Sequence, residues 1–525
     1  MASASYTLEV DWDNTWSIGA AAAFTHAQAN ITNDIITLHC RRGLAAGASL
    51  FHQLQSGQLT VELNNKTGKY SPNNTGSVLT GLIQPGHWVR LRTTAVDGGA
   101  YARTLWGGRL LNIKALGKAK NKVSYAVLTA IGDLGWHAKR VIQQMPKATL
   151  LSGSVFTKTM TAITGRTTFT NHTIDAGLFA FDVYTGEGKN GYDALYEICV
   201  AEAGRLYEDT EGKMGFKQRH ARLQDTKSVT AQATLSDAAG AAFSYDSIKQ
   251  VDSSEVGMIY NEVAADYQKR TAQAQATLWT LATTPSLLPG ESKTFWAIYP
   301  NLASPTNAVQ VNAWLTLVAT TDYLANSAAN GSGVDYTADI GVVLTKSTGY
   351  MQITLTNNAA VEIYITLLQA RGTPLTEDDA VRFVVEDTTS QAAYGDRRYP
   401  IVPILSPSLA PGAAGDVGTL DWARFHLAMY KDKFQMFDCE VMGNRSTATL
   451  QNLANLDLDN RVTVVANGDS QLGISSLDCF IEAIEHKIDK AKNHRTRYIL
   501  SETTPTGGWW TWGYAMWGTT TRFAY

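Results

Sequence analysis

The sequence predicts a multidomain protein that is mainly β with some α: two related small β-barrels, an α+β domain and an inserted β-sandwich. Its 525 residues exceed what one hydrophobic core holds, because domains typically contain about 100 to 200 residues. Hydrophobic residues make up 44% and charged residues 17% of the chain, as is typical of a folded protein. Short runs of alternating apolar and polar residues, bounded by Gly, Asn and Pro, recur along most of the chain. We therefore expect the ranges 1–137, 138–269, 270–403, 404–504 and 505–525 to be distinct parts.

Range 1–137 is expected to form the first barrel. Its best-patterned stretch, Gly57 to Asn112, joins strands by tight turns and carries few reactive side chains, which favours a shape-building role over a catalytic one. The predicted strands are YTLEVDW, DIITLHCRR, QLTVELN, HWVRLRT, ARTLWGGRLLNIK and NKVSYAVLTA.

Range 138–269 is expected to form the α+β domain. A helix is predicted in DLGWHAKRVIQQM at its start, because the apolar residues Leu134, Ala138, Val141 and Ile142 share one face. A second helix is predicted from Tyr192 to Ala203, followed by a hairpin that turns at Glu211-Gly212 and a strand in MIYNEVAADY.

Range 270–403 is rich in Thr and Ala, poor in charge, and is expected to form the β-sandwich through KTFWAIY, AVQVNAWLTLV, IGVVLT, MQITLTN and EIYITLLQAR. Range 404–504 begins with a helix from Leu420 to Lys431 and continues with the strands of the second barrel. The tetrapeptide KAKN occurs at 118–121 and again at 490–493, each time between two predicted strands. This equivalent placement indicates that the two barrels are an internal repeat.

Several motifs, in this order, resemble those of the tail-hub (minor tail) proteins of long-tailed, siphophage-type bacteriophages. They are ELNNKTGKYSP, GLIQPGHWVRLRTT, the hairpin GRLYEDTEGKMGF, the segment LLPGESKTFWA and the terminus WGTTTRFAY. The resemblance implies a structural homotrimer at the tail tip of the virion, made in the host cytoplasm, which adapts a sixfold tail tube to a threefold tip. It also implies contacts with the distal tail or tail tube protein, the tape measure protein, tip or fibre proteins and the host cell envelope.

DNA is expected to pass through the hub's channel without specific binding. The net charge is −3, so the chain has no excess of basic residues that would hold DNA through its phosphates. The start MASASYTLEVDW lacks the features of a signal peptide, and no apolar run approaches the roughly 18 to 20 residues of a membrane span.

No catalytic, cofactor-binding or metal-binding residues are predicted. The loop GEGKNG at 186–191 matches a dinucleotide-binding pattern, but no βαβ unit surrounds it, and we interpret it as a flexible loop before a helix. Adjacent His39 and Cys40 point to opposite faces of a strand and are not expected to share a metal. The acidic run Glu377 to Asp379 is expected to start a helix. The cysteines Cys40, Cys199, Cys439 and Cys479 are interpreted as buried free thiols, with a Cys439–Cys479 disulfide as the less favoured alternative.

Two sets of aromatic residues are candidate binding residues. The terminal set is expected to anchor a partner or neighbouring subunit, because Trp and Tyr are favoured at interfaces. Its members are Trp509, Trp510, Trp512, Tyr514, Trp517, Phe523 and Tyr525. The second set lies in the sandwich and comprises Trp279, Trp296, Trp314, Tyr323 and Tyr350. It supports the alternative function, a carbohydrate-binding protein that attaches to the host surface; an enzyme such as a peptidoglycan hydrolase is the least favoured hypothesis.

Overall fold

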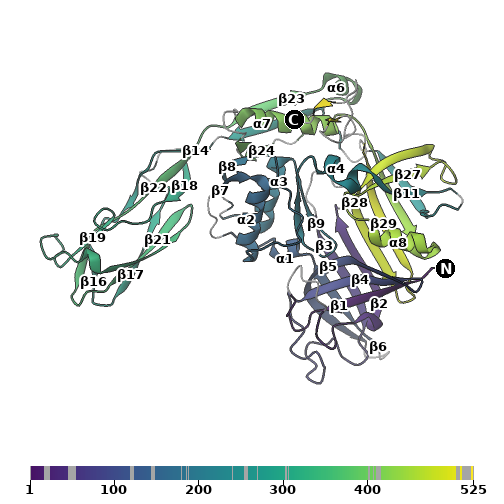
Figure 1. The fold of residues 1–525 in the computed structure, drawn as a ribbon, viewed down its shortest axis with the longest axis horizontal. Coiled ribbons are helices and arrows are strands. Elements are labelled where there is room, and N and C mark those ends of the chain that lie inside the picture. Colours follow the sequence, from purple (N-terminus) through teal and green to yellow (C-terminus); the bar gives the residue numbers. More distant parts are fainter. Residues whose placement is uncertain are drawn as a thin grey trace.

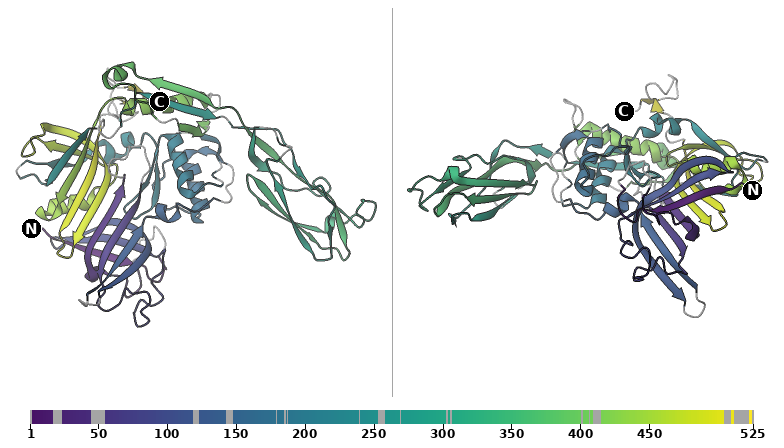
Figure 2. Two further views of the ribbon diagram at one scale, coloured as in Figure 1. Left: turned by 180° about the vertical axis from the view of Figure 1, so that it is seen from behind. Right: turned by 60° about the horizontal axis from the view of Figure 1, so that its bottom comes forward.

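In the computed structural model, an elongated β-sandwich projects from a larger body formed by the rest of the chain (Figure 1), and both views in Figure 2 show the same projection. The structure describes residues 2–16, 24–44, 55–118, 123–142, 148–178, 180–184, 186, 188–238, 240–252, 258–268, 270–301, 304, 307–399, 402–405, 407–408, 415–503, 509–510 and 522–523. The fold is mainly β with some α and has several domains, as the sequence predicts.

The N-terminal unit contains six strands that pair in the order β1-β4-β5-β6-β3-β2. They are β1 (Ala4–Val10), β2 (Ile35–Gly43), β3 (Gln55–Asn64), β4 (Trp88–Val96), β5 (Gly99–Lys118) and β6 (Val123–Ile131). Each of these strands overlaps a segment that the sequence predicts as a strand. The long hairpin β5–β6 extends well beyond the body of the unit (Figure 2).

The C-terminal unit also contains six strands, which pair in the order β11-β27-β28-β29-β26-β12. They are β11 (Ala231–Ser236), β12 (Ser247–Asp252), β26 (Gln435–Met442), β27 (Arg461–Ala466), β28 (Ile474–Asp489) and β29 (His494–Glu502), with α8 (Thr447–Asn455) between β26 and β27. Strands β11 and β12 lie inside the range 138–269, yet β11 pairs with β27 and β12 with β26, both of which lie much later in the chain.

The two units have the same topology, because strands one to six of each unit pair in the same order. One pairing differs in direction: β1 is antiparallel to β4, whereas β11 is parallel to β27. Lys118, the first residue of one KAKN segment, ends β5, and the other segment, 490–493, lies between β28 and β29. Residues 119–121 of the first segment lie outside the described residues. Neither set of strands closes into a barrel within the described residues; instead both units join one twelve-stranded sheet.

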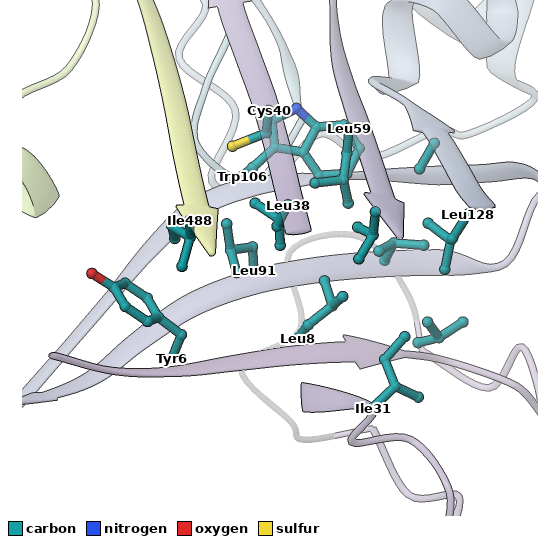
Figure 3. Packing of buried hydrophobic residues seen from close by; sticks show 14 of the residues in the cluster. Tyr6, Leu8, Ile31, Leu38, Cys40, Leu59, Leu91, Trp106, Leu128 and Ile488 are labelled. Atoms are coloured by element: carbon teal, nitrogen blue, oxygen red, sulfur yellow. The ribbon is translucent and has the colours of Figure 1, made fainter. Parts of the chain in front are cut away.

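The units are joined by an antiparallel pairing of β2 with β28, which we call the sheet joint. Leu38 and Cys40 of β2 and Ile488 of β28 belong to the hydrophobic cluster of the N-terminal unit. Figure 3 shows Ile488 beside Leu38 of β2, with Tyr6 of β1 nearby. Fully burying such a side chain stabilises a fold by about 1.5–3 kcal/mol, so the packing at the joint fixes the two units to each other.

The α+β region packs between the two units and the sandwich (Figure 1). Its single core unites residues from distant parts of the chain, including Phe156, Ile198, Phe216, Val263 and Trp422. Its first elements are α1 (Asp133–His137), β7 (Ala148–Leu151), α2 (Ser152–Thr164), β8 (Ala180–Tyr184), α3 (Gly191–Glu202), β9 (Arg205–Glu208), β10 (Met214–Lys217), α4 (Ala221–Gln224) and α5 (Thr226–Val229). The later elements are β13 (Glu262–Gln268), β23 (Val381–Glu386), α6 (Thr388–Tyr394), β24 (Val402–Leu405), β25 (Pro407–Ser408) and α7 (Gly415–Tyr430).

The sandwich has a core of its own, separate from the other clusters. Its strands are β14 (Arg270–Ala272), β15 (Ala276–Thr280), β16 (Ser286–Leu287), β17 (Ser292–Ile298), β18 (Ala308–Trp314), β19 (Tyr323–Asn326), β20 (Ile340–Lys346), β21 (Tyr350–Asn357) and β22 (Ile363–Glu377). One sheet is centred on β22, and the other has the order β17-β21-β20. The sandwich strands end at Glu377, within the expected range 270–403, and the next strand, β23, pairs with β13 of the α+β region.

Two local predictions are wrong. The helix predicted in DLGWHAKRVIQQM ends at His137, because the backbone groups of 138–142 bond to the GEGKNG loop: Ile142 N donates to Lys189 O at 3.0 Å, and Gly188 N to Ile142 O at 2.9 Å. Residues 143–145 of the predicted helix lie outside the described residues. The acidic run begins no helix, because Glu377 ends β22 and its carboxylate accepts a hydrogen bond from Arg270 Nε at 2.6 Å.

No helix in the described ranges has both the length and the apolar character to cross a membrane.

Candidate functional site

The sheet joint presents two chemically different faces. On the outward face, the imidazole of His39 lies 2.7 Å from the carboxylate of Glu485, and Lys487 lies 3.1 Å from the same carboxylate. Cys40, next to His39 in β2, is buried on the opposite face, as the strand alternation predicts. The joint is therefore polar outside and packed inside.

Two buried histidines lie on the inner face of the joint. His486 Nδ1 and His494 Nε2 are 3.0 Å apart, and His494 Nδ1 is 2.8 Å from the hydroxyl of Tyr6. Burial lowers the pKa of His494 to about 3, and burial together with the charges of His494 and Arg42 lowers the pKa of His486 well below its usual value. Both rings are therefore neutral near pH 7, and they hold β1, β28 and β29 together.

Strand β9 connects the α+β region to both units. At one end, Glu208 accepts hydrogen bonds from Gly57 N at 2.5 Å and Leu134 N at 2.7 Å. Its burial raises the pKa of Glu208 to about 8, although these donors oppose the shift. At the other end, Arg205 lies 2.6 Å from the carboxylate of Glu482 in β28. A single short strand thus fixes the positions of both units.

A cluster of charges surrounds Glu482. Arg222 of α4 bonds to Glu482 at 2.8 Å and to Asp459 at 2.7 Å, and Arg205 also pairs with Asp459. Burial raises the pKa of Glu482, and the charge of Arg205 opposes that shift. Removing one partner would leave an uncompensated buried charge, so the cluster holds the C-terminal unit against the α+β region.

A second charged cluster fixes the N-terminal unit. The buried Asp133 of α1 bonds to Arg109 of β5 at 2.8 Å and to Arg166 at 2.7 Å. Burial alone would raise the pKa of Asp133, but a hydrogen bond from His137 and the charges of Arg166 and Arg109 hold it well below its usual range. These contacts are structural connections and not a catalytic constellation.

Strand β12 and part of β5 each lack a partner strand on one side among the described residues. Strand β12 ends the twelve-stranded sheet and pairs only with β26. Beyond Arg109, β5 pairs only with β6. Leu111 and Leu116 on this part of β5 are 38% and 43% exposed. An unpaired edge with exposed leucines is a surface to which another strand can pair.

The two edges correspond to the two strands of the sheet joint. A bulge lies between Leu110 and Asn112 in β5 and between Ile481 and Ala483 in β28, which aligns the two hairpins. The cross-strand row in the N-terminal unit is Ile113, Leu128, Val61 and Leu38. The equivalent row in the C-terminal unit is Ile484, Tyr498, Cys439 and Ile248. Thus β12 corresponds to β2, and the free part of β5 corresponds to the part of β28 that β2 covers.

The sandwich aromatics are not all on one surface. Trp314 and Tyr323 belong to the core, where Trp314 Nε1 donates to Ser347 O at 2.6 Å, and Trp279 packs against the same core. Trp296 is 49% exposed. Its ring centroid lies 5.2 Å from that of Tyr350. The five therefore divide into Trp314, Tyr323 and Trp279 at the core and the neighbouring pair Trp296 and Tyr350 on another face of the sandwich.

For the terminal aromatic residues, the structure describes only a parallel backbone pairing of β30 (Trp509–Trp510) with β31 (Arg522–Phe523). Trp512, Tyr514, Trp517 and Tyr525 lie outside the described residues. Their role at an interface stays a prediction.

The described residues contain no group of three His, Cys, Asp or Glu side chains placed to hold a metal ion. All four cysteines are buried free thiols, which confirms their interpretation. Cys439 and Cys479 lie on β26 and β28, with β29 between them. The GEGKNG loop has a structural role: it caps α3 through Asn190, whose side chain accepts a hydrogen bond from Asp193 N at 2.9 Å. The strands on either side of α3, β8 and β9, belong to different sheets.

No family model matches the chain, and no curated protein matches it. Solved structures similar to it include the 43 kDa tail protein of prophage MuSo2 from Shewanella oneidensis, with a TM-score of 0.45 and 10% identity over 95% of this chain and 98% of that one. A tail protein from Neisseria meningitidis MC58 has a TM-score of 0.47 and 9% identity over 95% and 96% of the two chains. The prophage tail protein gp18 from Listeria monocytogenes EGD-e has a TM-score of 0.38 and 8% identity, with 94% of each chain covered. All three are tail proteins, and two of them are described as prophage proteins.

Proposed function

We propose that this chain is a structural tail protein of a bacteriophage that assembles into a trimeric hub at the tail tip. In the assembly, six topologically equivalent units from three copies form a ring around the channel through which DNA leaves. The observation that carries the proposal is the correspondence between the free edges of β12 and β5 and the paired edges of β2 and β28. The tail-hub motifs of the sequence support the same role.

The sheet joint provides a template for the contact between copies. Within the chain, Leu38 of β2 lies opposite Ile488 of β28, which is four residues after Ile484. Ile248 is the equivalent of Leu38, and Ile113 is the equivalent of Ile484. The same register therefore places Ile248 of one copy opposite Gly117 of the next, four residues after Ile113, and Lys249 opposite Leu116. Such a contact uses different surfaces on the two copies, so repeating it closes a ring when the rotation per step divides a full turn.

A disulfide between copies tests this register. A chain carrying both Lys249→Cys and Leu116→Cys is expected to form covalent dimers and trimers under mild oxidation, seen on a denaturing gel without reductant. The buried native thiols are not expected to interfere. Each single variant should remain a monomer on that gel, and the misregistered pair Lys249→Cys with Lys114→Cys should cross-link far less. Equal cross-linking of both pairs, or none in assembled particles, would contradict the pairing.

A charge on the β5 edge tests the assembly itself. Leu116 is already partly exposed, so Leu116→Lys should leave the fold intact while placing a second ammonium group opposite Lys249 of the incoming strand, and like charges directly opposite each other destabilise a strand pair. We expect the trimer mass to give way to the monomer mass in light scattering at matched concentration. Val78→Lys, at a 63% exposed position between β3 and β4, is the matched control and should remain trimeric. A wild-type chain that is monomeric at high concentration would overturn the proposed hub.

A further inference from the structure

The sheet β17-β21-β20 of the sandwich has an outer face of unusual composition. Its positions are set by the antiparallel register, in which Trp296 lies opposite Gln352 and Gln352 opposite Thr345. The neighbouring row is Thr294, Thr354 and Val343, and Ile298 pairs with Tyr350. The alternate side chains, such as Ala297, Met351 and Ile353, are buried in the sandwich core. The outer side chains therefore form one continuous surface.

Aromatic and aliphatic groups on this face are open to solvent. Trp296 is 49% exposed, Ile298 58% and Val343 66%. The ring of Tyr350 meets that of Trp296 at an angle of 56°, so the two rings form a tilted pair instead of packing into a core. Exposed apolar groups gathered on one surface mark interaction sites. An indole and a phenol combine an apolar face with a polar edge, which suits ligands that have both.

The rest of the face consists of neutral hydrogen-bonding groups. The hydroxyls of Ser292 and Thr356 are 2.7 Å apart, and those of Thr294 and Thr354 are 3.0 Å apart. Gln352 lies in the row between Trp296 and Thr345. None of the outer positions named here carries a charge, and the flanking Lys346 bonds to Trp314 O, away from this face, at 3.2 Å.

We propose that this face binds a neutral saccharide chain. The apolar face of a sugar ring stacks on Trp296 and Tyr350, while its hydroxyls bond to Gln352 and Thr345. An anionic polymer finds no cation here, and a charged peptide finds no counter-charge. β17 spans about 20 Å along this face, which is long enough for an oligosaccharide. The sandwich that carries this face projects from the body (Figure 1).

Binding of the full chain to immobilised neutral glucans, galactans and mannans, with polysialic acid as an anionic comparison, tests the proposal. We expect binding to a neutral polymer that Trp296→Ala weakens at least about tenfold, since truncating a central aromatic anchor commonly has this effect. Trp296→Phe should retain part of the binding. Val334→Ala, at a 62% exposed position off this sheet, should bind like wild type.

Three outcomes would overturn the proposal: binding to no neutral polymer, binding only to the anionic one, or equal binding by Trp296→Ala. The mass of the assembled particle is measured for the same variants. If Trp296→Ala dissociates the assembly, the face contacts another copy and not a saccharide. The hub proposal rests on other strands and is unaffected by failure of saccharide binding.

Discussion

The buried histidine pair makes the stability of the sheet joint depend on pH. His486 and His494 face Tyr6 from β1, Thr496 from β29 and the positive charge of Arg42 from β2. Burial lowers both pKa values, that of His494 to about 3, so the unfolded chain binds protons near pH 6.5 on these rings that the folded chain does not bind at that pH. The free energy of unfolding contributed by these rings therefore falls as pH drops below 6.5.

We expect His494→Gln to remove part of this acid sensitivity. Lowering the pH from 6.5 to 5 should reduce the free energy of unfolding of the wild type by about 2 kcal/mol more than that of the variant. Glu208 acts in the opposite direction, because its raised pKa makes its contribution decline as pH rises toward 8. Comparing urea unfolding of variant and wild type at both pH values cancels that effect. His26→Gln is the control, and an unchanged pH response in His494→Gln would contradict the assignment.

Glu208 tests how β9 is held against the N-terminal unit. Both carboxylate oxygens accept hydrogen bonds, from Leu134 N and from Gly57 N. Glu208→Gln places an amide NH₂ against one of these donors, and the variant should lose about 1–3 kcal/mol of stability in chemical denaturation. Glu362→Gln, on the sandwich surface, should be neutral. If Glu208→Gln equals or exceeds the wild type, the burial of the carboxyl group would outweigh its hydrogen bonds.

At the scale of elements, the sequence predicts the strands and hairpins that alternating polarity and turn residues specify locally. The hairpin β9–β10 and the strands β5 and β6 are confirmed, because alternation and turn residues specify them within a few residues. The pairings of β11 with β27 and β12 with β26 could not be predicted, since their partners lie far away in the chain and leave no local signal. The short α1 is a similar case, because the GEGKNG loop satisfies backbone groups that a longer helix would have used.

The candidate binding residues divide along the same line. The composition of the sandwich points to its aromatic residues as a group. Whether a given ring is exposed depends on the face of the strand to which it points and on which strands and sheets pack against that face, and the sequence does not show this. Trp296 alternates with the buried Ala297 and faces outward, whereas Trp314 ends β18 with its ring in the core. The free edges of β5 and β12 have no sequence motif, because they are defined by the pairing order of the strands in both units.

The sandwich lies between two adjacent positions of the rest of the chain. Arg270 of β14 and Glu377 of β22 are paired partners, so the chain enters and leaves the sandwich at adjacent positions. Replacing Thr271–Thr376 with Asn-Gly should close a two-residue hairpin there. We expect the shortened chain to fold and to keep the trimer mass in light scattering, because both free edges lie elsewhere. An insoluble or monomeric product would show that the sandwich takes part in folding or assembly.

For the whole molecule, the repeat explains why one chain carries both an internal joint and two open edges. The N-terminal unit has edges at β2 and β5, and the C-terminal unit has the equivalent edges at β12 and β28. Within the chain, β2 pairs with β28. The remaining pair, β12 and β5, is complementary by the same topology. A long exposed edge is an aggregation hazard unless it is covered, and the proposed ring would cover the edges of β12 and β5.

The separate cores predict how the whole molecule unfolds. The sandwich cluster shares no residue with the clusters of the α+β region or of the two units, whereas these are linked by the sheet joint and by β9. Calorimetry should therefore resolve at least two transitions. Met351→Ala, which removes a fully buried side chain from the sandwich, should lower only one of them, because such a truncation costs about 2–5 kcal/mol in its own core. Leu128→Ala should lower only the other. A single transition that both variants shift equally would mean that the sandwich and the body unfold as one cooperative unit.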